Sequence, residues 1–283
     1  MNATNVVLWS GGFNSTYMLL KLLGNDNVQK PIHVVTFSGS LLGSAKATRE
    51  KYARAKINNY IDQKQIITHK ISISTNDEIN LFTTEEIISC LTIIPQVIMG
   101  DDINIWMGFD LYDNMLGLKM KSILDFLKSY SNIIGRNLHL YTPHLTNGKE
   151  NIIAELLILY EDIFKNCVTC DFMVGSFCGG CDSCLNLKKS LYHAHNMIHD
   201  SEYKKKIKRY AQLWFHEDIS DIVTDQRYLC NCGLCNPDSG NATPKLMNPY
   251  KSIIKPKRNV TPSIQILSDD EAKDLLNNMK DDK

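Results

Sequence analysis

The chain has 283 residues and a mass of 32.2 kDa; 43% of the residues are apolar and 22% are charged. This composition is typical of a folded globular protein and excludes a disordered or fibrous one. Lys and Arg together number 31, as do Asp and Glu, so no overall field draws the chain to nucleic acid or to an anionic membrane. No apolar run approaches the roughly 20 residues that span a bilayer, and the first residues lack a secretory leader. We therefore expect a cytoplasmic protein that binds any anion through a local site.

The first half of the chain alternates between strand and helix patterns. Apolar runs typical of buried strands are followed by segments with helical spacing, in the order strand 6–9, helix 17–23, strand 32–37, helix 46–61, strand 66–73, strand 103–108, helix 114–130 and strand 138–141. Strands separated by helices of this length predict an α/β fold with a parallel sheet covered on both faces.

The second half divides into a helical part and a tail. From Lys149 the pattern turns helical, is interrupted by a cysteine cluster, and resumes as helices from Leu185 to about Phe215. Beyond Leu229 the chain is rich in proline and has little apolar periodicity. We expect three parts: a nucleotide-binding α/β domain over residues 1–148, a helical zinc-binding subdomain over 149–228, and a cysteine-containing, proline-rich tail over 229–283.

A glycine-rich turn joins the first predicted strand to the first predicted helix. Its residues are Ser10, Gly11, Gly12, Phe13, Asn14, Ser15 and Thr16. Adjacent glycines let the backbone approach an anion, and the start of the helix adds the positive end of its dipole. The turn has neither the lysine of a Walker A loop nor the third glycine of a dinucleotide fingerprint. Both an anion-binding nest and a plain capped turn account for these residues.

Most of the nine cysteines are clustered. Cys170, Cys178, Cys181 and Cys184 have the spacing C-x7-C-x2-C-x2-C, which suits four thiolates around a tetrahedral zinc ion. Four sulfur ligands leave no open coordination position, so such a zinc ion organises structure instead of activating water. The nearby Cys167 is either an unused thiol or an alternative ligand, whereas the isolated Cys90 reads as a small buried hydrophobe.

The glycine-rich turn resembles the pyrophosphatase loop of the ATP pyrophosphatase (PP-loop) superfamily, Ser-Gly-Gly-x-Asp-Ser, with Asn14 at the aspartate position. Its combination with the cysteine spacing resembles the 7-cyano-7-deazaguanine synthase family over residues 5 to 200. Landmarks between the two motifs agree in order: Pro95, then Gly108 with Asp110 and Asp113, then Pro143 with Lys149.

This resemblance implies a PP-loop type of sheet and an ATP-dependent carbon–nitrogen ligase. The implied reaction adenylates the carboxylate of 7-carboxy-7-deazaguanine and converts it with ammonia to the amide and then the nitrile. The implied cofactors are ATP, Mg²⁺ and Zn²⁺, and the family suggests a homodimer. The implied catalytic residues are Lys149 and Asp113, and the implied cofactor-binding residues are Ser10, Gly11, Gly12, Asn14, Ser15, Thr16, Phe37 and Gly108.

Several departures from the family pattern indicate a divergent member. Residues 38–40 read Ser-Gly-Ser where the family has Tyr-Gly-Gln, and no histidine follows before Arg49. Leu187 and Lys188 stand where an arginine is expected. Two alternatives therefore stay open. One is a relative that stops at the amide or joins the deazaguanine to another amine for DNA or protein modification. The other is a catalytically silent nucleotide-binding protein.

A second cysteine group, Cys230, Cys232 and Cys235, offers three thiols in the tail. A second zinc site needs a fourth ligand, for which Cys167 and His216 are candidates; free thiols and a segment that docks a protein partner are the alternatives. The basic run at 204–209 is interpreted as the solvated face of a helix. We therefore expect small-molecule substrates, and neither a membrane nor direct nucleic-acid binding.

Overall fold

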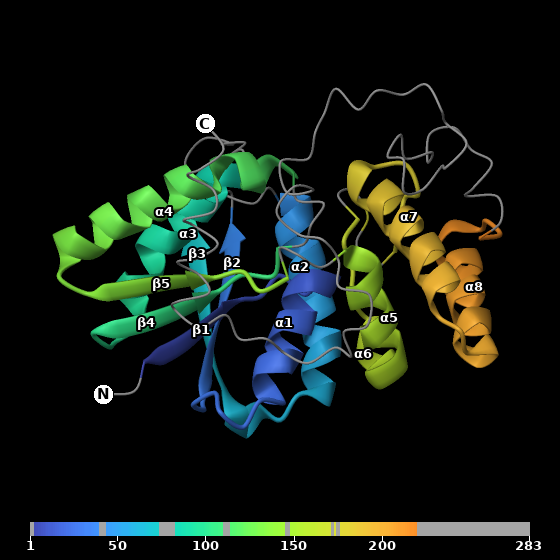
Figure 1. Ribbon diagram of the computed structural model, residues 1–283, viewed down its shortest axis with the longest axis horizontal. Helices are drawn as coiled ribbons and strands as arrows, with labels where there is room; N and C mark the ends of the chain where they lie inside the picture. The colour runs from blue at the N-terminus through green and yellow to red at the C-terminus, as the bar shows by residue number, and fades with distance from the viewer. Residues whose placement is uncertain are drawn as a thin grey trace. The chain divides into compact units, whose positions relative to one another are not determined.

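The computed structural model describes residues 3–39, 44–73, 83–109, 114–144, 148–170, 173 and 176–219. Residues 1–219 form one compact unit, in which helices flank a five-stranded parallel sheet (Figure 1). The predicted α/β class with a parallel sheet is confirmed. Among the described ranges, no helix combines the length and the apolar character needed to cross a membrane.

The strands are β1 (Thr4–Leu8), β2 (Ile32–Gly39), β3 (Ile66–Ile73), β4 (Asp102–Trp106) and β5 (Asn137–Tyr141). The helices are α1 (Phe13–Leu23), α2 (Ser44–Ile57), α3 (Thr83–Val97), α4 (Asn114–Ile134), α5 (Lys149–Leu159), α6 (Glu161–Phe164), α7 (Asp182–Met197) and α8 (Ser201–Phe215). Two short 3₁₀ turns, Asn58–Tyr60 and Gln63–Gln65, separate α2 from β3. The strand order β3-β2-β1-β4-β5 places β1 at the centre, where Val6 pairs with His33 on one side and Ile105 on the other.

The two faces of the sheet are covered by different helices. The helices α3 and α4 cover one face, and α1 and α2 cover the other (Figure 1). The α3/α4 face holds a hydrophobic core to which strand residues such as Val6, Val35 and Ile105 contribute, together with Leu91 and Ile94 of α3. Right-handed crossovers between parallel strands require this division, because the chain moves across the sheet in one direction up to β3 and in the other afterwards.

The helix α3 is not among the elements predicted from the sequence. Its β-branched residues and the internal Pro95 disfavour a helix by local propensity. Pro95 falls in the last turn, where the guanidinium of Arg136 donates hydrogen bonds to the carbonyl oxygens of Pro95, Ile98 and Gly100. Tertiary packing and this distant arginine therefore stabilise a helix that its own sequence favours weakly.

Helices follow residue 148 on both sides of the cysteine segment, as the sequence pattern predicts. The helix α5 packs against α1 and α7, and α7 against α8. Asp200 caps α8 by accepting hydrogen bonds from the amides of Glu202 and Tyr203, which explains the break between α7 and α8. An aromatic cluster joins α1, α6 and α8, with ring centroids of Phe13 and Phe164 5.4 Å apart.

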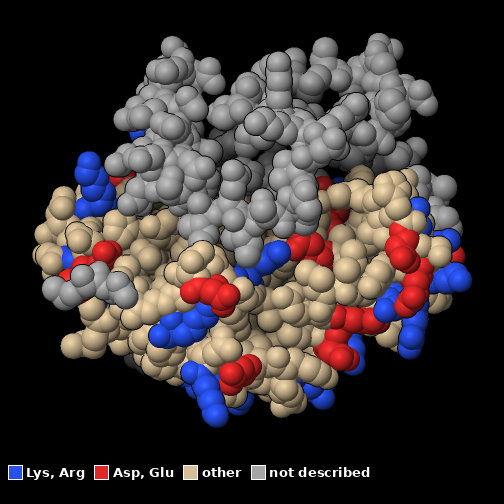
Figure 2. Space-filling view, turned by 60° about the horizontal axis from the view of Figure 1, so that its bottom comes forward, with Lys and Arg blue, Asp and Glu red and all other residues tan. Residues whose placement is uncertain are grey.

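The basic run at 204–209 lies in α8, and Lys206 forms an ion pair with Glu161 at 2.7 Å. Lys205, Lys208 and Arg209 are exposed. On the face of the molecule shown in Figure 2, basic and acidic side chains alternate over the surface of the described residues. These observations agree with the interpretation of the run as a solvated helix face.

Candidate nucleotide-binding loop and metal centre

The glycine loop, residues 10–16, leads from the carboxyl end of the central strand β1 into α1. The chain turns to opposite sides of the sheet around β1, so this loop lies at the topological switch point where parallel α/β proteins bind ligands. Gly11 has φ +86°, a conformation that favours glycine. Gly12 is the N-cap of α1 and provides no side-chain cap. The first-turn amides of α1 have no acceptor within the helix, and the helix dipole favours an anion beside them.

Three hydroxyl side chains shape the loop from inside. The Oγ atoms of Ser10 and Ser15 are 2.9 Å apart, and the amide of Ser10 donates to Ser15 Oγ at 3.2 Å. Thr16 is fully buried, and its hydroxyl accepts a hydrogen bond from Trp9 Nε1 at 3.0 Å. These bonds hold the loop in a defined shape without any ligand, which reduces the entropy lost when an anion binds.

Three glycines allow other segments to approach the loop closely. A Cβ on Gly11 would lie 2.9 Å from Cβ of Ala53 in α2. A Cβ on Gly12 would lie 3.3 Å from Cγ2 of Thr169. Gly108, which follows β4, lies so close to the start of α1 that its Cβ would be 2.6 Å from the backbone carbonyl of Asn14. The predicted loop residues and Gly108 are therefore brought together.

Buried charged residues of α2 lie behind the loop. Arg49, Glu50 and Arg54 are only 6%, 5% and 8% exposed. Arg54 donates hydrogen bonds to the carbonyl oxygens of Trp9 and Ser10, both at 3.3 Å, and pairs with Glu50 at 3.2 Å. Burial lowers the pKa of Arg54, and the carboxylate of Glu50 opposes this effect. Sequence reasoning treated this helix as merely polar, and only the approach of two distant segments reveals the role of its charges.

The four predicted cysteine ligands come together. The sulfur atoms of Cys170, Cys178, Cys181 and Cys184 all lie within 4.8 Å of one another, and those of Cys178 and Cys184 are 3.9 Å apart. Four sulfurs at about 2.3 Å from a tetrahedral zinc ion are separated by about 3.8 Å. Backbone amides already donate to these sulfurs, as from Met173 to Cys170 at 3.2 Å. The cluster can therefore hold a metal ion.

The thiols of this centre differ in their protonation. Burial acts to raise the pKa of Cys178, but hydrogen bonds from the amides of Gly180 and Cys181 outweigh it and lower the value to about 7. Burial raises the pKa of Cys184. A metal ion must displace the protons of its thiol ligands. Cys178 is exposed, whereas Cys184 is buried.

Cys167 stands apart from the four-sulfur cluster. It is fully buried and forms a side-chain hydrogen bond with Thr16 beneath the glycine loop. Burial raises its pKa to about 12, and the bond with Thr16 opposes the shift only in part. Of the two roles left open by the sequence, this position favours an unused, protonated thiol.

Other predicted site residues are placed less directly. Phe37 is 7% exposed and packs in the hydrophobic core on the α3/α4 face. Lys149 is the first residue of α5, the helix that packs against α1. Asp110, Asp113 and the group Cys230, Cys232 and Cys235 lie outside the described residues. His216, considered above as a further ligand, is the exposed C-cap of α8.

Sequence reasoning did not single out His144, which follows β5. It is 7% exposed, and its ring lies 4.7 Å from the ring of Tyr17 between centroids. Within the described part of the chain, neither ring nitrogen has a hydrogen-bond partner. Burial and then the nearby Lys21 lower its pKa to about 4, so the imidazole is neutral at neutral pH. A single histidine without a patterned neighbour gives no signal in the sequence.

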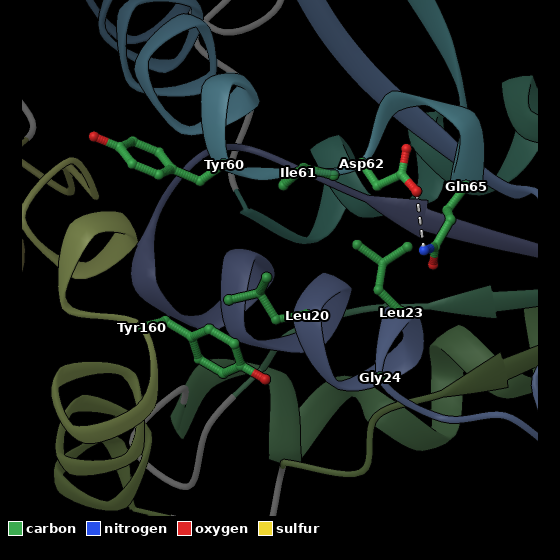
Figure 3. A pocket seen from close by; sticks show the side chains of 8 residues that line it. All are labelled: Leu20, Leu23, Gly24, Tyr60, Ile61, Asp62, Gln65 and Tyr160. Atoms are coloured by element: carbon green, nitrogen blue, oxygen red, sulfur yellow. Dashed lines mark hydrogen bonds between the residues drawn. The ribbon is translucent and has the colours of Figure 1, made fainter.

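A shallow hollow of about 200 Å³ lies at the far end of α1, away from the glycine loop (Figure 3). It is lined by Leu20, Leu23, Gly24, Tyr60, Ile61, Asp62, Gln65 and Tyr160. The carboxylate of Asp62 accepts hydrogen bonds from the amide of Lys64 and the side chain of Gln65, and these bonds lower its pKa. Asp62 thus caps a 3₁₀ turn, and the hollow contains none of the predicted site residues.

No protein-family model and no curated protein matches this chain. An uncapped helix start at the switch point of the sheet lies beside a four-thiol cluster, and the segment 167–170 connects them. Such an arrangement can bind a phosphate group on one side and a structural metal on the other.

Proposed function

We propose that this protein is an ATP-dependent enzyme that activates the carboxylate of a 7-deazaguanine at the glycine loop. The observation that carries the proposal is the position of the loop. The start of α1, which has no side-chain cap, lies at the switch point of a parallel sheet, next to a cluster that can hold a metal ion. The sequence resemblance adds the substrate, 7-carboxy-7-deazaguanine.

The chemistry requires activation because a carboxylate is a poor electrophile. A carboxylate oxygen of the substrate attacks the α-phosphorus of ATP, the bond to the β-phosphate oxygen breaks, and pyrophosphate leaves. Ammonia then attacks the acyl carbon, the bond from that carbon to the phosphate oxygen breaks, AMP leaves with the oxygen and the electron pair, and a proton is released to give the amide. The amide oxygen then attacks the α-phosphorus of a second ATP, and pyrophosphate leaves again. Loss of AMP and of the two remaining protons on nitrogen gives the nitrile.

The role of the chain in these steps is binding and charge neutralisation. The amides at the start of α1 hold the pyrophosphate, and Lys149, at the start of α5, neutralises its charge. Asn14 retains one acceptor oxygen where the resembled family has a carboxylate, so it could help to hold a magnesium ion but would supply no negative charge to it. By the resemblance, Asp113 contacts the substrate or the metal ion.

We further propose zinc as the metal at the four cysteines. With four thiolates, zinc has no open position and supplies structural cross-linking only. The 3.9 Å separation of Cys178 and Cys184 sulfurs supports this choice.

The test is to incubate the pure, zinc-loaded chain with ATP, Mg²⁺, ammonia and 7-carboxy-7-deazaguanine and to identify products by mass spectrometry. Nitrile formation supports the full reaction, and an amide or amine adduct supports a divergent ligase. ATP binding without turnover supports a silent nucleotide-binding protein. Failure to bind ATP at millimolar concentration overturns the proposal.

A pair of variants locates the activity. Ser15→Ala removes the hydroxyl that shapes the loop, and we expect a loss of pyrophosphate release. Ser190→Ala is the matched control, because the Ser190 hydroxyl donates to the carbonyl of Asn186 within α7. Equal rates of pyrophosphate release by the two variants would show that the reaction does not depend on the loop.

A further inference from the structure

The glycine loop and the cysteine centre are connected by two sets of contacts. In the first, the amide of Val168 donates to the carbonyl oxygen of Gly11 at 3.4 Å, and Thr169 packs against Gly12. Cys170, the first metal ligand, is the next residue along the chain. The cysteine centre is therefore joined to the backbone of the loop through Val168 and Thr169.

The second set runs through α2. The guanidinium of Arg49 donates a hydrogen bond to the carbonyl oxygen of Cys170 and lies 3.8 Å from the carboxylate of Glu50. Glu50 pairs in turn with Arg54, which donates hydrogen bonds to the carbonyl oxygens of Trp9 and of Ser10, the first residue of the loop. Buried charges are costly to displace singly, because each leaves its partner uncompensated. This network fixes Cys170 and the start of the loop relative to each other.

We infer that Arg49 is a positioning residue through which metal occupancy of the cysteine centre sets the shape, and so the anion affinity, of the glycine loop. The inference rests on the proposed function for the identity of the anion, which is pyrophosphate or the phosphates of ATP. A metal ion holds Cys170 in place, and Arg49 transmits this position to Glu50 and Arg54. Without the metal, the carbonyl that Arg49 binds loses its fixed position.

Coupling between two sites is reciprocal and changes affinity by about 5- to 150-fold in typical cases. We expect about a tenfold effect here, because both sets of contacts involve backbone atoms of the loop. The loop amides should exchange with solvent more slowly in the metal-loaded protein. This second readout does not depend on nucleotide binding.

The experiment uses the full chain loaded with zinc and compares the wild type with Arg49→Lys. Lysine keeps the charge but lacks the planar fork that reaches two acceptors. We expect one metal ion per chain in both proteins, a pyrophosphate dissociation constant about tenfold higher in Arg49→Lys, and faster hydrogen exchange at residues 9–16. Amides of α3, on the opposite face of the sheet, serve as the internal reference and should not change.

Lys206→Met is the matched control, because it removes an ion pair with Glu161 in the same compact unit but outside this network. It should leave both readouts at wild-type values. Wild-type affinity and loop exchange in Arg49→Lys would overturn the inference. If the wild type binds no pyrophosphate, the proposed function fails, and the exchange of residues 9–16 in metal-loaded and metal-free protein still decides the coupling.

Discussion

Apolar residues are buried on both faces of the sheet, but the α1/α2 face also buries polar and charged groups. Towards α3 and α4, the strands present Val6, Val35, Ile103 and Ile105 to an apolar core. Towards α1 and α2, the same sheet is accompanied by buried polar and charged groups. One such group is Asn5, whose Oδ1 accepts hydrogen bonds from Trp106 Nε1 at 3.0 Å and Asn104 Nδ2 at 3.3 Å.

This difference indicates that the α3/α4 face serves as the scaffold, whereas the α1/α2 face carries the candidate site. Apolar burial stabilises the sheet without specifying which atoms must meet, since it depends mainly on area. Buried charges cost free energy unless they are paired, so they persist where they hold particular segments together. On the α1/α2 face they hold the glycine loop and Cys170 in register. A partly exposed ion pair between Lys21 and Glu155, at 2.6 Å, links α1 to α5.

The largest effect is expected when one ligand of the cysteine centre is removed. Cys184→Ser should lower the metal content from one ion per chain to near zero and destabilise the protein by several kcal/mol, because structural zinc contributes folding free energy directly. Elemental analysis and chemical denaturation measure both effects. Cys90→Ser, a buried cysteine in the apolar core, is the control and should retain its metal. Loss of metal in both variants would contradict the assignment of the ligands.

An apolar truncation on the other face should affect stability alone. Leu91 is fully buried in the core under α3, and Leu91→Ala should lower the free energy of unfolding by about 2–5 kcal/mol. The folded variant should bind metal and pyrophosphate as the wild type does. A changed affinity for either would show that the two faces are not independent.

Low pH should lower the stability of the folded protein through His144. The unfolded histidine takes up a proton below about pH 6.5, whereas burial holds the folded pKa at about 4. The unfolded state therefore binds more protons between these values, and stability falls as the pH drops from 6.5 to 4, by on the order of 3 kcal/mol in total.

Denaturation curves of wild type and His144→Gln across this range measure the effect. The variant should lose most of the slope. His33 and His69, whose pKa values burial also lowers, retain a smaller slope of the same sign. If the stability of His144→Gln depends on pH as strongly as that of the wild type, groups other than His144 cause the pH dependence.

A methyl group at the junction of β4 and α1 should disturb the loop. Gly108→Ala places a Cβ 2.6 Å from the carbonyl of Asn14, and overpacking of this kind costs about 1–3 kcal/mol. Pyrophosphate affinity should fall with it. Gly24→Ala is the control, because its nearest neighbour would be 3.4 Å away at the C-cap of α1.

The smallest effect should come from the solvated face of α8. Lys206→Met breaks a half-exposed ion pair with Glu161, and such pairs contribute about 0–1 kcal/mol. Thermal denaturation should detect little change. A large drop in the melting temperature would show that α8 is held to the rest of the unit by this contact.

The sequence by itself determined the parallel α/β class, the five strands, the turn between β1 and α1, and the four cysteines that meet. Each of these follows from local periodicity or from spacing within one short segment, such as the interval from Cys170 to Cys184. Whether the loop binds ATP stays a prediction, and so does the role of Asp113.

Only the tertiary structure decided how the parts support one another. The helix α3 forms despite Pro95 because the distant Arg136 satisfies its last carbonyl groups. The buried charges of α2 find their partners only in the folded chain. Arg49, for example, donates a hydrogen bond to the carbonyl oxygen of Cys170, which lies 121 positions further along the sequence. The physical reason is that a buried charge is stable only with a partner. Sequence spacing does not reveal that partner when the chain must fold to bring it near.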